Sequence, residues 1–347
     1  DPLGAGTVSG APARRRCRQQ APNEATSAPA GHRESCRKAR AVTDTVEIRH
    51  IAKRFGKVEA VRDVSLTLGE GETIALVGHN GAGKTTLMKL MLGLIRPTSG
   101  TIRVLGDDPA AGEFAARRRL GYLPENVSFN TALTGQETLA FYARLKRQNK
   151  RTVGSLLERV GLTHAADRRV GTYSKGMRQR LGLAQALLGE PRILLLDEPT
   201  TGLDPALRQT FYDIVEELRA RGATVLLSSH ALTELEERAG RVVIMNRGLK
   251  VADGTLDELR RIAKLPTRIR LKVTDEALSD VPSWLGPVDD WRRVNGHVVE
   301  IDASHDQKIA VLRRATGEGA PVEDLDVVPP TLDELYAHFL RTQEAVQ

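Results

Sequence analysis

The sequence has few cysteines and no long apolar run. Both of its cysteines, Cys17 and Cys36, lie in the first 45 residues, so the rest of the chain has no thiol for a disulfide or a cysteine-ligated metal. Apolar runs such as 87–95 and 193–196 fall far short of the roughly 20 residues that a membrane-spanning helix needs. We therefore expect a protein of a reducing compartment that does not cross a membrane by itself.

The body of the chain also lacks metal-binding clusters, heptad repeats and a strong charge imbalance. The eight histidines and four methionines do not recur at metal-ligand spacings, and no heptad pattern is sustained. The first 45 residues hold eight Lys or Arg against four acids, so they carry +4 of the net charge of +7 and the other 302 residues carry only +3. A body so nearly balanced gives little reason to expect a nucleic-acid partner.

What the chain does have is the composition of a folded protein with more than one domain: 347 residues, of which 40% are hydrophobic and 27% charged. Residues 1–45 are rich in Ala, Pro and Arg and lack an apolar segment, so we expect a disordered basic tail and not a secretory signal. From residue 46 onward short apolar strands alternate with helix-like runs, which indicates an α/β fold with parallel strands. We place this domain at 46–264, with a helical part at about 123–188. A small α/β accessory domain follows at 265–347.

The segment GHNGAGKTT follows the expected strand 73–77 and opens the expected helix 83–95. It matches the pattern G-x-x-x-x-G-K-[ST], which forms phosphate-binding loops between a strand and a helix. The glycines let backbone amides turn toward a phosphate, Lys84 neutralises the terminal phosphates, and Thr85 offers its hydroxyl to Mg²⁺. A glycine-rich turn alone would explain the glycines but not the Lys-Thr pair. The candidate phosphate-binding residues are Gly78, His79, Asn80, Gly81, Ala82, Gly83, Lys84, Thr85 and Thr86.

Two acidic residues and a histidine follow further apolar strands. Asp197 and Glu198 end the run ILLLDE, and His230 ends ATVLLSSH. Because ligands bind at the carboxyl ends of strands in open α/β sheets, we expect these side chains to face the phosphate loop. There Asp197 can hold the Mg²⁺ shell, Glu198 can polarise a water for attack on the γ-phosphate, and His230 points toward that phosphate. Without the loop, two such acids would be read as a solvated turn and a lone histidine as structural.

Two other features leave their roles open. Phe55, in KRFGK, can stack on an adenine face or serve as a core aromatic. The segment TYSKGMRQRLG places Ser174 and Gly176 before a helix-forming run. Serine is a good N-cap, so by itself this turn indicates only the start of a helix.

In their order and spacing, these motifs make residues 46 to about 264 resemble the nucleotide-binding subunit of an ATP-binding-cassette (ABC) transporter. The resemblance implies a P-loop ABC-type domain with a RecA-like core sheet and a helical subdomain, which hydrolyses ATP with Mg²⁺. The positions that it assigns are a Q-loop at Glu125, a signature at 173–177, a Walker B strand with Asp197 and Glu198, a D-loop at Asp204, a switch histidine at His230, and metal ligation by Thr85, Glu125 and Asp197.

The same resemblance implies two subunits that close head to tail. Ser174 and Gly176 of one subunit would bind the γ-phosphate held by the other, and the free amides and dipole of a helix N-terminus suit an anion. The implied partners are a second copy of this chain and separate ABC permease subunits in the inner membrane. The implied location is peripheral, on the cytoplasmic side of that membrane.

Two motifs depart from the family pattern. The usual signature Leu-Ser-Gly-Gly-Gln reads YSKGM here, with Lys175 and Met177 in place of Gly and Gln. Glu125 replaces the Q-loop glutamine, and it can still reach Mg²⁺ or its water. Both departures resemble those of exporter-type cassettes, so we expect an active ATPase.

Within the family, the segments GHNGAGKTT, LGYLPENVSF and PPTLDELYAHFL resemble the ATPase of the transporter that supports maturation of nitrous oxide reductase, a system associated with copper-centre assembly and sulfur export. One alternative is the ATPase of a drug or polysaccharide exporter. Alternatives of other classes are a soluble cassette ATPase that acts on ribosomes or DNA, and a gene regulator. The single phosphate loop and the lack of heptads or a helix-turn-helix pattern disfavour these last two.

Overall fold

The computed structural model describes residues 44–112, 117–278, 281–285 and 291–346. The expected tail 1–45, with both cysteines, lies outside the described residues except for Asp44 and Thr45, which begin the first strand. No helix in the described ranges is long and apolar enough to span a membrane.

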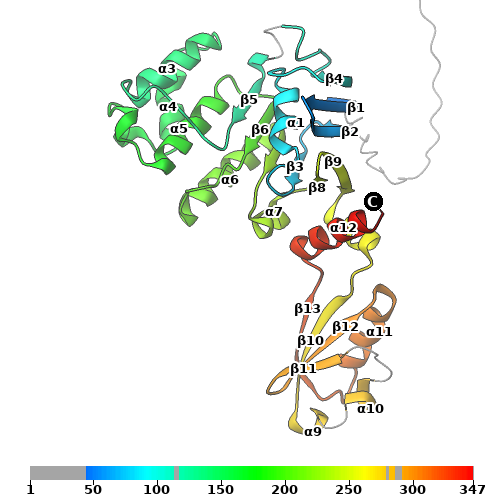
Figure 1. The fold of residues 1–347 in the computed structure, drawn as a ribbon. Helices are drawn as coiled ribbons and strands as arrows, with labels where there is room; N and C mark the ends of the chain where they lie inside the picture. The colour runs from blue at the N-terminus through cyan, green and yellow to red at the C-terminus, as the bar shows by residue number, and fades with distance from the viewer. Residues whose placement is uncertain (1–43, 113–116, 279–280, 286–290, 347) are drawn as a thin grey trace, which may run out of the picture. The chain divides into compact units, whose positions relative to one another are not determined.

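The centre of the fold is a six-stranded sheet in the order β5-β6-β7-β3-β8-β9 (Figure 1). All neighbouring strands are parallel except β9, which forms an antiparallel hairpin with β8. The interior strands are uninterrupted apolar runs because both faces of the sheet are covered. The strand bounds are β5 (Leu120–Leu123), β6 (Ile193–Asp197), β7 (Thr224–Ser228), β3 (Thr73–Val77), β8 (Arg241–Asn246) and β9 (Leu249–Gly254). The expected α/β class with parallel strands is confirmed.

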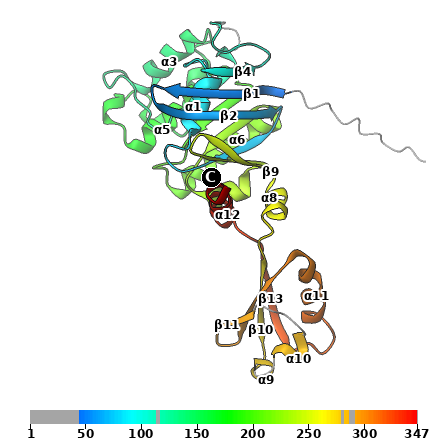
Figure 2. The same ribbon diagram turned by 45° about the vertical axis from the view of Figure 1, so that its right-hand side comes forward.

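A second, antiparallel sheet covers one side of the first. It has the order β2-β1-β4, with β1 (Asp44–Phe55), β2 (Val58–Gly69) and β4 (Ser99–Val104), and Figure 2 shows β1 and β2 lying side by side. Helix α1 (Lys84–Met91) shares one hydrophobic cluster with these strands and with β3. The residue before α1 is Gly83, so the expected phosphate loop does lie between a strand and a helix.

Helices dominate the next part of the chain, as expected. They are α3 (Gly135–Leu145), α4 (Thr152–Arg159) and α5 (Lys175–Leu187), with short 3-10 turns at Thr163–Ala165 and Val170–Thr172. Helix α3 begins with a capping box, in which the Thr134 hydroxyl accepts the Glu137 N–H and the Glu137 carboxylate accepts the Thr134 N–H, the spacing that Thr134 and Glu137 have in the sequence.

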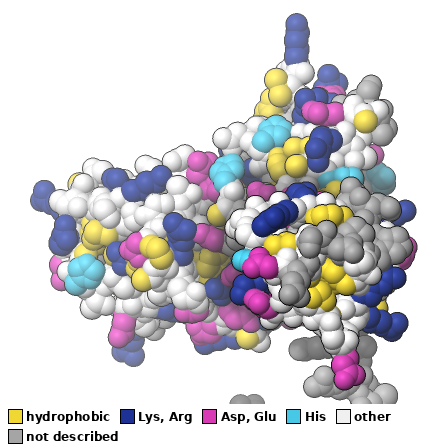
Figure 3. Space-filling model, turned by 90° about the horizontal axis from the view of Figure 1, so that it is seen from below, with side chains coloured by type: hydrophobic (Ala, Val, Ile, Leu, Met, Phe, Trp, Pro, Cys, Tyr) yellow, Lys and Arg dark blue, Asp and Glu magenta, His cyan; other side chains and the backbone are white. Residues whose placement is uncertain are grey.

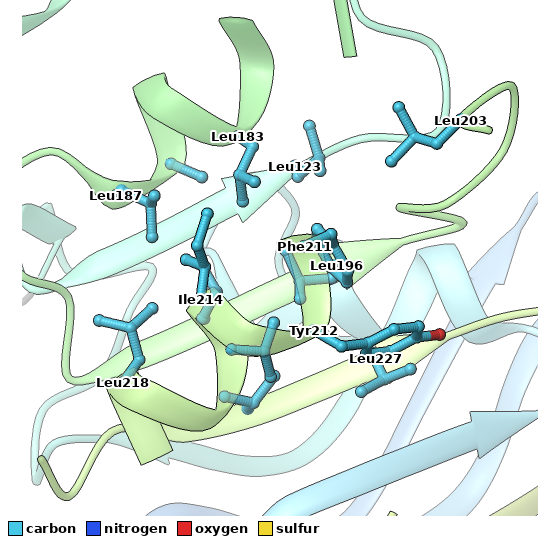
Figure 4. Close-up of a cluster of buried hydrophobic side chains, with 14 of the residues drawn as sticks. Leu123, Leu183, Leu187, Leu196, Leu203, Phe211, Tyr212, Ile214, Leu218 and Leu227 are labelled. Carbon is cyan, nitrogen blue, oxygen red and sulfur yellow. The ribbon is translucent and has the colours of Figure 1, made fainter. Parts of the chain in front are cut away.

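Helices α6 (Pro205–Ala220) and α7 (Leu232–Arg238) follow the two strands that carry the candidate acids and histidine. Figure 4 shows Phe211, Ile214 and Leu218 of α6 directed toward the sheet, near Leu196 of β6 and Leu227 of β7. This packing fixes the positions of the strand ends at which the candidate site residues stand.

The C-terminal segment begins with α8 (Leu256–Ala263) and continues into a four-stranded antiparallel sheet, β11-β12-β10-β13, with its own hydrophobic cluster. Its elements are β10 (Thr267–Val273), α9 (Asp275–Leu278), α10 (Val281–Leu285), β11 (Trp291–Asn295), β12 (Val298–Ala303), α11 (His305–Ala315), β13 (Val322–Val328) and α12 (Leu332–Val346). The sequence analysis groups α12 with these strands. In the structure, Leu332, Leu335 and Phe339 of α12 belong to the hydrophobic cluster of the larger domain.

Charged side chains of both signs are mixed on the surface. On the face in Figure 3, blue basic and magenta acidic side chains alternate among the coloured residues. This face therefore presents no continuous basic stripe among its described side chains.

Candidate functional site

The loop from Gly78 to Gly83 connects β3 to α1 and has room only for glycine at its ends. A Cβ at Gly78 would lie 2.6 Å from the Met245 carbonyl oxygen, and one at Gly83 would lie 2.5 Å from the carbonyl oxygen of Ala60. Gly81 and Gly83 have positive φ angles of 86° and 104°. These glycines therefore satisfy real steric demands, and the loop packs closely on β2 and on the end of β8.

Lys84 is buried at the start of α1. Its ammonium donates to the carbonyl oxygens of Gly78 and His79, within its own loop. Burial lowers the pKa of Lys84, while Glu198 and Asp197 oppose that shift by favouring the charged ammonium. A cation that is partly stripped of water and held by its own loop is well placed for an incoming anion.

Thr85 and Asp197 meet across the cleft between α1 and β6. The Thr85 hydroxyl donates to Asp197 Oδ2 at 2.7 Å, and the Ser228 hydroxyl at the end of β7 donates to Asp197 Oδ1, also at 2.7 Å. Both carboxylate oxygens are thus oriented by side chains from two different elements. This is the arrangement that the shared carboxyl edge of parallel strands predicts.

Glu198 follows Asp197 in a left-handed conformation with φ of 49°, and its side chain is buried. Its Oε2 accepts the His230 backbone N–H at 3.1 Å, and its Oε1 lies 3.3 Å from His230 Nε2 without a geometrically satisfactory hydrogen bond. Burial raises the pKa of the Glu198 carboxyl, against the opposing effects of His230 and Lys84. A strained, buried carboxylate with one oxygen not hydrogen-bonded is a common feature of functional sites.

A cleft of about 440 Å³ joins these groups. It is lined by all of the predicted residues from His79 to Thr86, and by Glu125, Asp197, Glu198 and His230. Additional lining residues that the sequence analysis did not assign are Val58, Glu59, Ala60, Arg62 and Arg247. Arg247 stands in the turn of the β8–β9 hairpin, and the Arg-Gly sequence of a turn does not by itself indicate that the turn reaches a site.

The remaining predicted site residues do not line this cleft. Phe55 is 49% exposed, with the Lys53 ammonium 4.9 Å from its ring centroid. Ser174 is the N-cap of α5, and its hydroxyl accepts the Met177 N–H at 3.2 Å. Asp204 caps α6 in the same way by accepting the Leu207 N–H at 2.9 Å. Gly176 is partly buried, and a Cβ there would lie 3.1 Å from the Gly202 carbonyl oxygen.

No group of three or more His, Cys, Asp or Glu side chains in the described ranges forms a metal-binding cluster. Asp197, Glu125 and the Thr85 hydroxyl nevertheless contribute oxygen atoms to one cleft. A divalent cation that takes most of its ligands from water and phosphate needs no larger protein cluster.

Comparison with known proteins identifies the family of this chain. Residues 61–201 match the ABC transporter family. An uncharacterized ABC transporter ATP-binding protein, YxlF of Bacillus subtilis, is 44% identical over 220 residues, which cover 62% of this chain and 72% of that protein. The daunorubicin resistance ATP-binding protein DrrA3 of Streptomyces coeruleorubidus is 35% identical over 296 residues, 83% of this chain and 93% of that protein.

A solved structure of the ATP binding subunit of an ABC transporter superposes with a TM-score of 0.60 at 33% identity, and the match covers 63% of this chain and 92% of that one. The fold, the phosphate loop and the likeness to nearly full-length relatives therefore agree. The chain belongs to the family of ATP-binding subunits of ABC transporters, the ATPases that couple ATP hydrolysis to transport.

Proposed function

We propose that the cleft between α1 and the ends of β6 and β7 binds Mg²⁺-ATP and hydrolyses it to drive export through a separate membrane permease. The observation that carries the proposal is the buried carboxylate of Glu198, which stands in the same cleft as Lys84 and the glycine loop. In this arrangement the loop amides and the Lys84 ammonium bind the terminal phosphates. Phe55, exposed at the end of β1, is a candidate to stack on the adenine.

Thr85 and Asp197 are suited to hold Mg²⁺, with Glu125 exposed at the cleft as a further oxygen donor. Hydroxyl and carboxylate oxygens are the ligands that this cation takes, together with phosphate and water. When bound, Mg²⁺ supplies positive charge to the phosphate oxygens. The hydrogen bond from Ser228 keeps the Asp197 carboxylate oriented toward Thr85.

Glu198 is the proposed general base. Its Oε1 lacks a satisfactory hydrogen bond, so it can accept a proton from a water molecule, and its raised pKa increases its basicity. His230 holds the other carboxylate oxygen through its backbone N–H, and its ring is 55% exposed, where it can approach the γ-phosphate.

The exposed N-termini of α5 and α6 support a head-to-tail homodimer. Ser174 and Asp204 are exposed N-caps outside the cleft of their own subunit. In the proposed dimer, Ser174 and Gly176 contact the γ-phosphate bound by the other subunit, and Asp204 lies near that nucleotide. The subunit then works peripherally on the cytoplasmic side of the inner membrane, with separate permease subunits.

The relatives favour export of a drug-like compound as the transport task. The match to the daunorubicin-resistance relative is 296 residues long, whereas only 264 residues precede position 265, so that match includes part of the C-terminal segment. Likeness in at least part of the C-terminal segment is therefore shared with a daunorubicin resistance ATP-binding protein. Maturation of nitrous oxide reductase remains the second candidate, and it rests on the segments LGYLPENVSF and PPTLDELYAHFL.

The test is a Glu198→Gln replacement in the native host. The export proposal predicts lower tolerance to daunorubicin-like compounds, with a fully copper-loaded nitrous oxide reductase wherever the host makes that enzyme. The maturation proposal predicts the reverse: a reductase that is made and exported without its copper-sulfur centre, and unchanged drug tolerance. A strain with neither defect would refute both tasks.

A further inference from the structure

The C-terminal helix α12 is anchored on the nucleotide-binding domain. Leu332 and Leu335 are fully buried, and they share a hydrophobic cluster with α7 and α8. At the start of the helix, Arg260 of α8 donates to the Pro330 carbonyl oxygen at 3.0 Å, and the Glu236 carboxylate accepts the Leu332 N–H at 3.3 Å. The first turns of α12 are therefore fixed, and this fixes the direction in which its last turn runs.

The last turn of α12 reaches the phosphate loop through a relay of three side chains. Gln343 Oε1 accepts a hydrogen bond from Asn246 Nδ2 at 2.8 Å, and Asn246 Oδ1 lies 2.7 Å from Nε2 of His79. Asn246, the final residue of β8, is 3% exposed. A buried amide needs partners on both its oxygen and its nitrogen, and here α12 supplies one and the phosphate loop supplies the other.

The relay can be satisfied in two ways. His79 Nδ1 lies 2.6 Å from the Asn80 carbonyl oxygen, which can only accept, so Nδ1 must carry a proton. With the amides as placed, His79 Nε2 donates to Asn246 Oδ1. With both amides reversed, Asn246 Nδ2 donates to His79 Nε2, and Gln343 donates to Asn246. In either case Gln343 is the end of the chain of hydrogen bonds.

Other contacts tie the same region together. Gly248, two residues after Asn246, donates its N–H to the Ala82 carbonyl oxygen at 3.0 Å, which links the β8–β9 turn to the loop directly. Burial raises the pKa of the Tyr336 phenol of α12, against a smaller opposing effect of the His79 backbone amide, and the phenol oxygen has no satisfactory hydrogen bond among the described residues. The Arg247–Glu344 pair at 3.3 Å is more than half exposed on both sides and contributes little.

We propose that Gln343 and Asn246 are positioning residues of the nucleotide site, and that α12 thereby holds His79 and the phosphate loop in the conformation that binds ATP. The C-terminal segment is then a working part of the ATP site. This inference rests on the proposed role of Gly78–Thr86 in phosphate binding. Its energetic basis is preorganisation: a loop held in its binding conformation loses less entropy when the ligand arrives.

The experiment measures binding of a non-hydrolysable ATP analogue to the full chain by calorimetry. Gln343→Met keeps the length of the side chain but removes its hydrogen bond, and we expect about a fivefold weaker affinity from the loss of one such bond. Gln343→Glu keeps an acceptor but no donor, so it should restore most of the affinity if Asn246 donates to Gln343, as the amides are placed, and should not restore it if both amides are reversed. Thr342→Val is the matched control, because the Thr342 hydroxyl donates to the His338 carbonyl within the same helix.

A second readout follows the imidazole nitrogens of His79 by NMR. Gln343→Met should shift these resonances, and Thr342→Val should not. An affinity for Gln343→Met within twofold of the wild type, or an equal loss in Thr342→Val, would overturn the proposal. Lys84→Ala leaves the side-chain hydrogen bonds of Gln343, Asn246 and His79 available, although it removes the bond from Lys84 to the His79 carbonyl oxygen, and it tests the phosphate loop separately. If Lys84→Ala bound the analogue normally, the proposed function would fail. The His79 resonances of Gln343→Met would still show whether the hydrogen bonds from Gln343 through Asn246 to His79 exist.

Discussion

Replacing Glu198 with glutamine separates ATP binding from hydrolysis. Glutamine keeps the volume of this buried side chain and an oxygen that can accept the His230 N–H, so the local structure should persist. It removes the base that Oε1 provides, and general bases contribute about 10²- to 10⁴-fold to rates, or about 3–5 kcal/mol in the barrier. We expect a turnover lowered by that factor with ATP affinity unchanged or higher, since the triphosphate meets one fewer negative charge.

The same substitution has a pH signature. Because burial raises the pKa of Glu198, the base is ionised only above that raised pKa, and wild-type activity should fall as the pH drops through it. The residual activity of Glu198→Gln should lack this acid limb. The free energy of unfolding of the wild type should fall as the pH rises, because the raised pKa means that ionising the buried Glu198 carboxyl destabilises the folded state. Glu198→Gln has no such charge, so it should melt at a higher temperature than the wild type near pH 8.

The assays are steady-state phosphate release, calorimetry with ATP and thermal melting, all on the purified chain. Glu237→Gln is the matched control, because Glu237 is exposed on α7 and does not line the cleft. Turnover of Glu198→Gln within threefold of the wild type would refute the assignment of the base. A loss of turnover with a tenfold loss of ATP affinity would instead indicate that the substitution damages the site as a whole.

Two further predictions concern the loop and the dimer. Gly83→Ala should lower the free energy of unfolding by about 1–3 kcal/mol and weaken ATP binding, because Gly83 has φ of 104° and a Cβ would lie 2.5 Å from the Ala60 oxygen. Gly154→Ala is the control: it lies in α4, its Cβ would have no atom within 4 Å, and its free energy of unfolding should be equal or up to about 1 kcal/mol higher. Equal effects of the two substitutions in a melting experiment would contradict the steric argument. Lys84→Ala should weaken ATP binding about 10- to 100-fold by calorimetry, since it removes charge-assisted hydrogen bonds. A mixture of the Lys84→Ala and Ser174→Arg chains should regain nucleotide-induced dimerisation by gel filtration, because in the mixed dimer both substitutions affect the same one of the two nucleotide sites. A mixture that dimerises no better than either variant alone would exclude the head-to-tail arrangement.

The sequence predicts many of the residues that line the cleft because their patterns are local. The phosphate loop, the strand that ends at Asp197 and the strand before His230 are all short patterns with a fixed order. The rule that ligands bind at the carboxyl edge of parallel strands is enough to bring them together. The register of β3, β6 and β7 places these ends side by side, and Thr85 and Asp197 are in contact. The capping box at Thr134 is predictable for the same local reason.

Long-range packing is what the sequence does not predict. The pairing of β1 with both β2 and β4 in a separate antiparallel sheet depends on contacts between distant segments. All five residues of β11 are exposed, so its sequence has no alternation of apolar and polar residues that would predict a strand there. The segment at α12 is recognisable as a helix, but its apolar residues fit a small C-terminal domain and the larger domain equally well on pattern alone.

The position of α12 changes how the C-terminal segment is understood. Asn246 and Gln343 are 97 residues apart in sequence, and between them lies a whole antiparallel sheet with its own core. Closing a loop of this length costs more conformational entropy than closing a short connection. The chain nevertheless returns to place the Gln343 amide against the buried Asn246, next to the phosphate loop. The apolar contacts of Leu332, Leu335 and Phe339 are what offset that cost, since burial of each such side chain contributes about 1.5–3 kcal/mol. The sheet of β10–β13 is therefore attached to the larger domain at both ends, through α8 on one side and α12 on the other, and α12 connects it to His79 through Gln343 and Asn246.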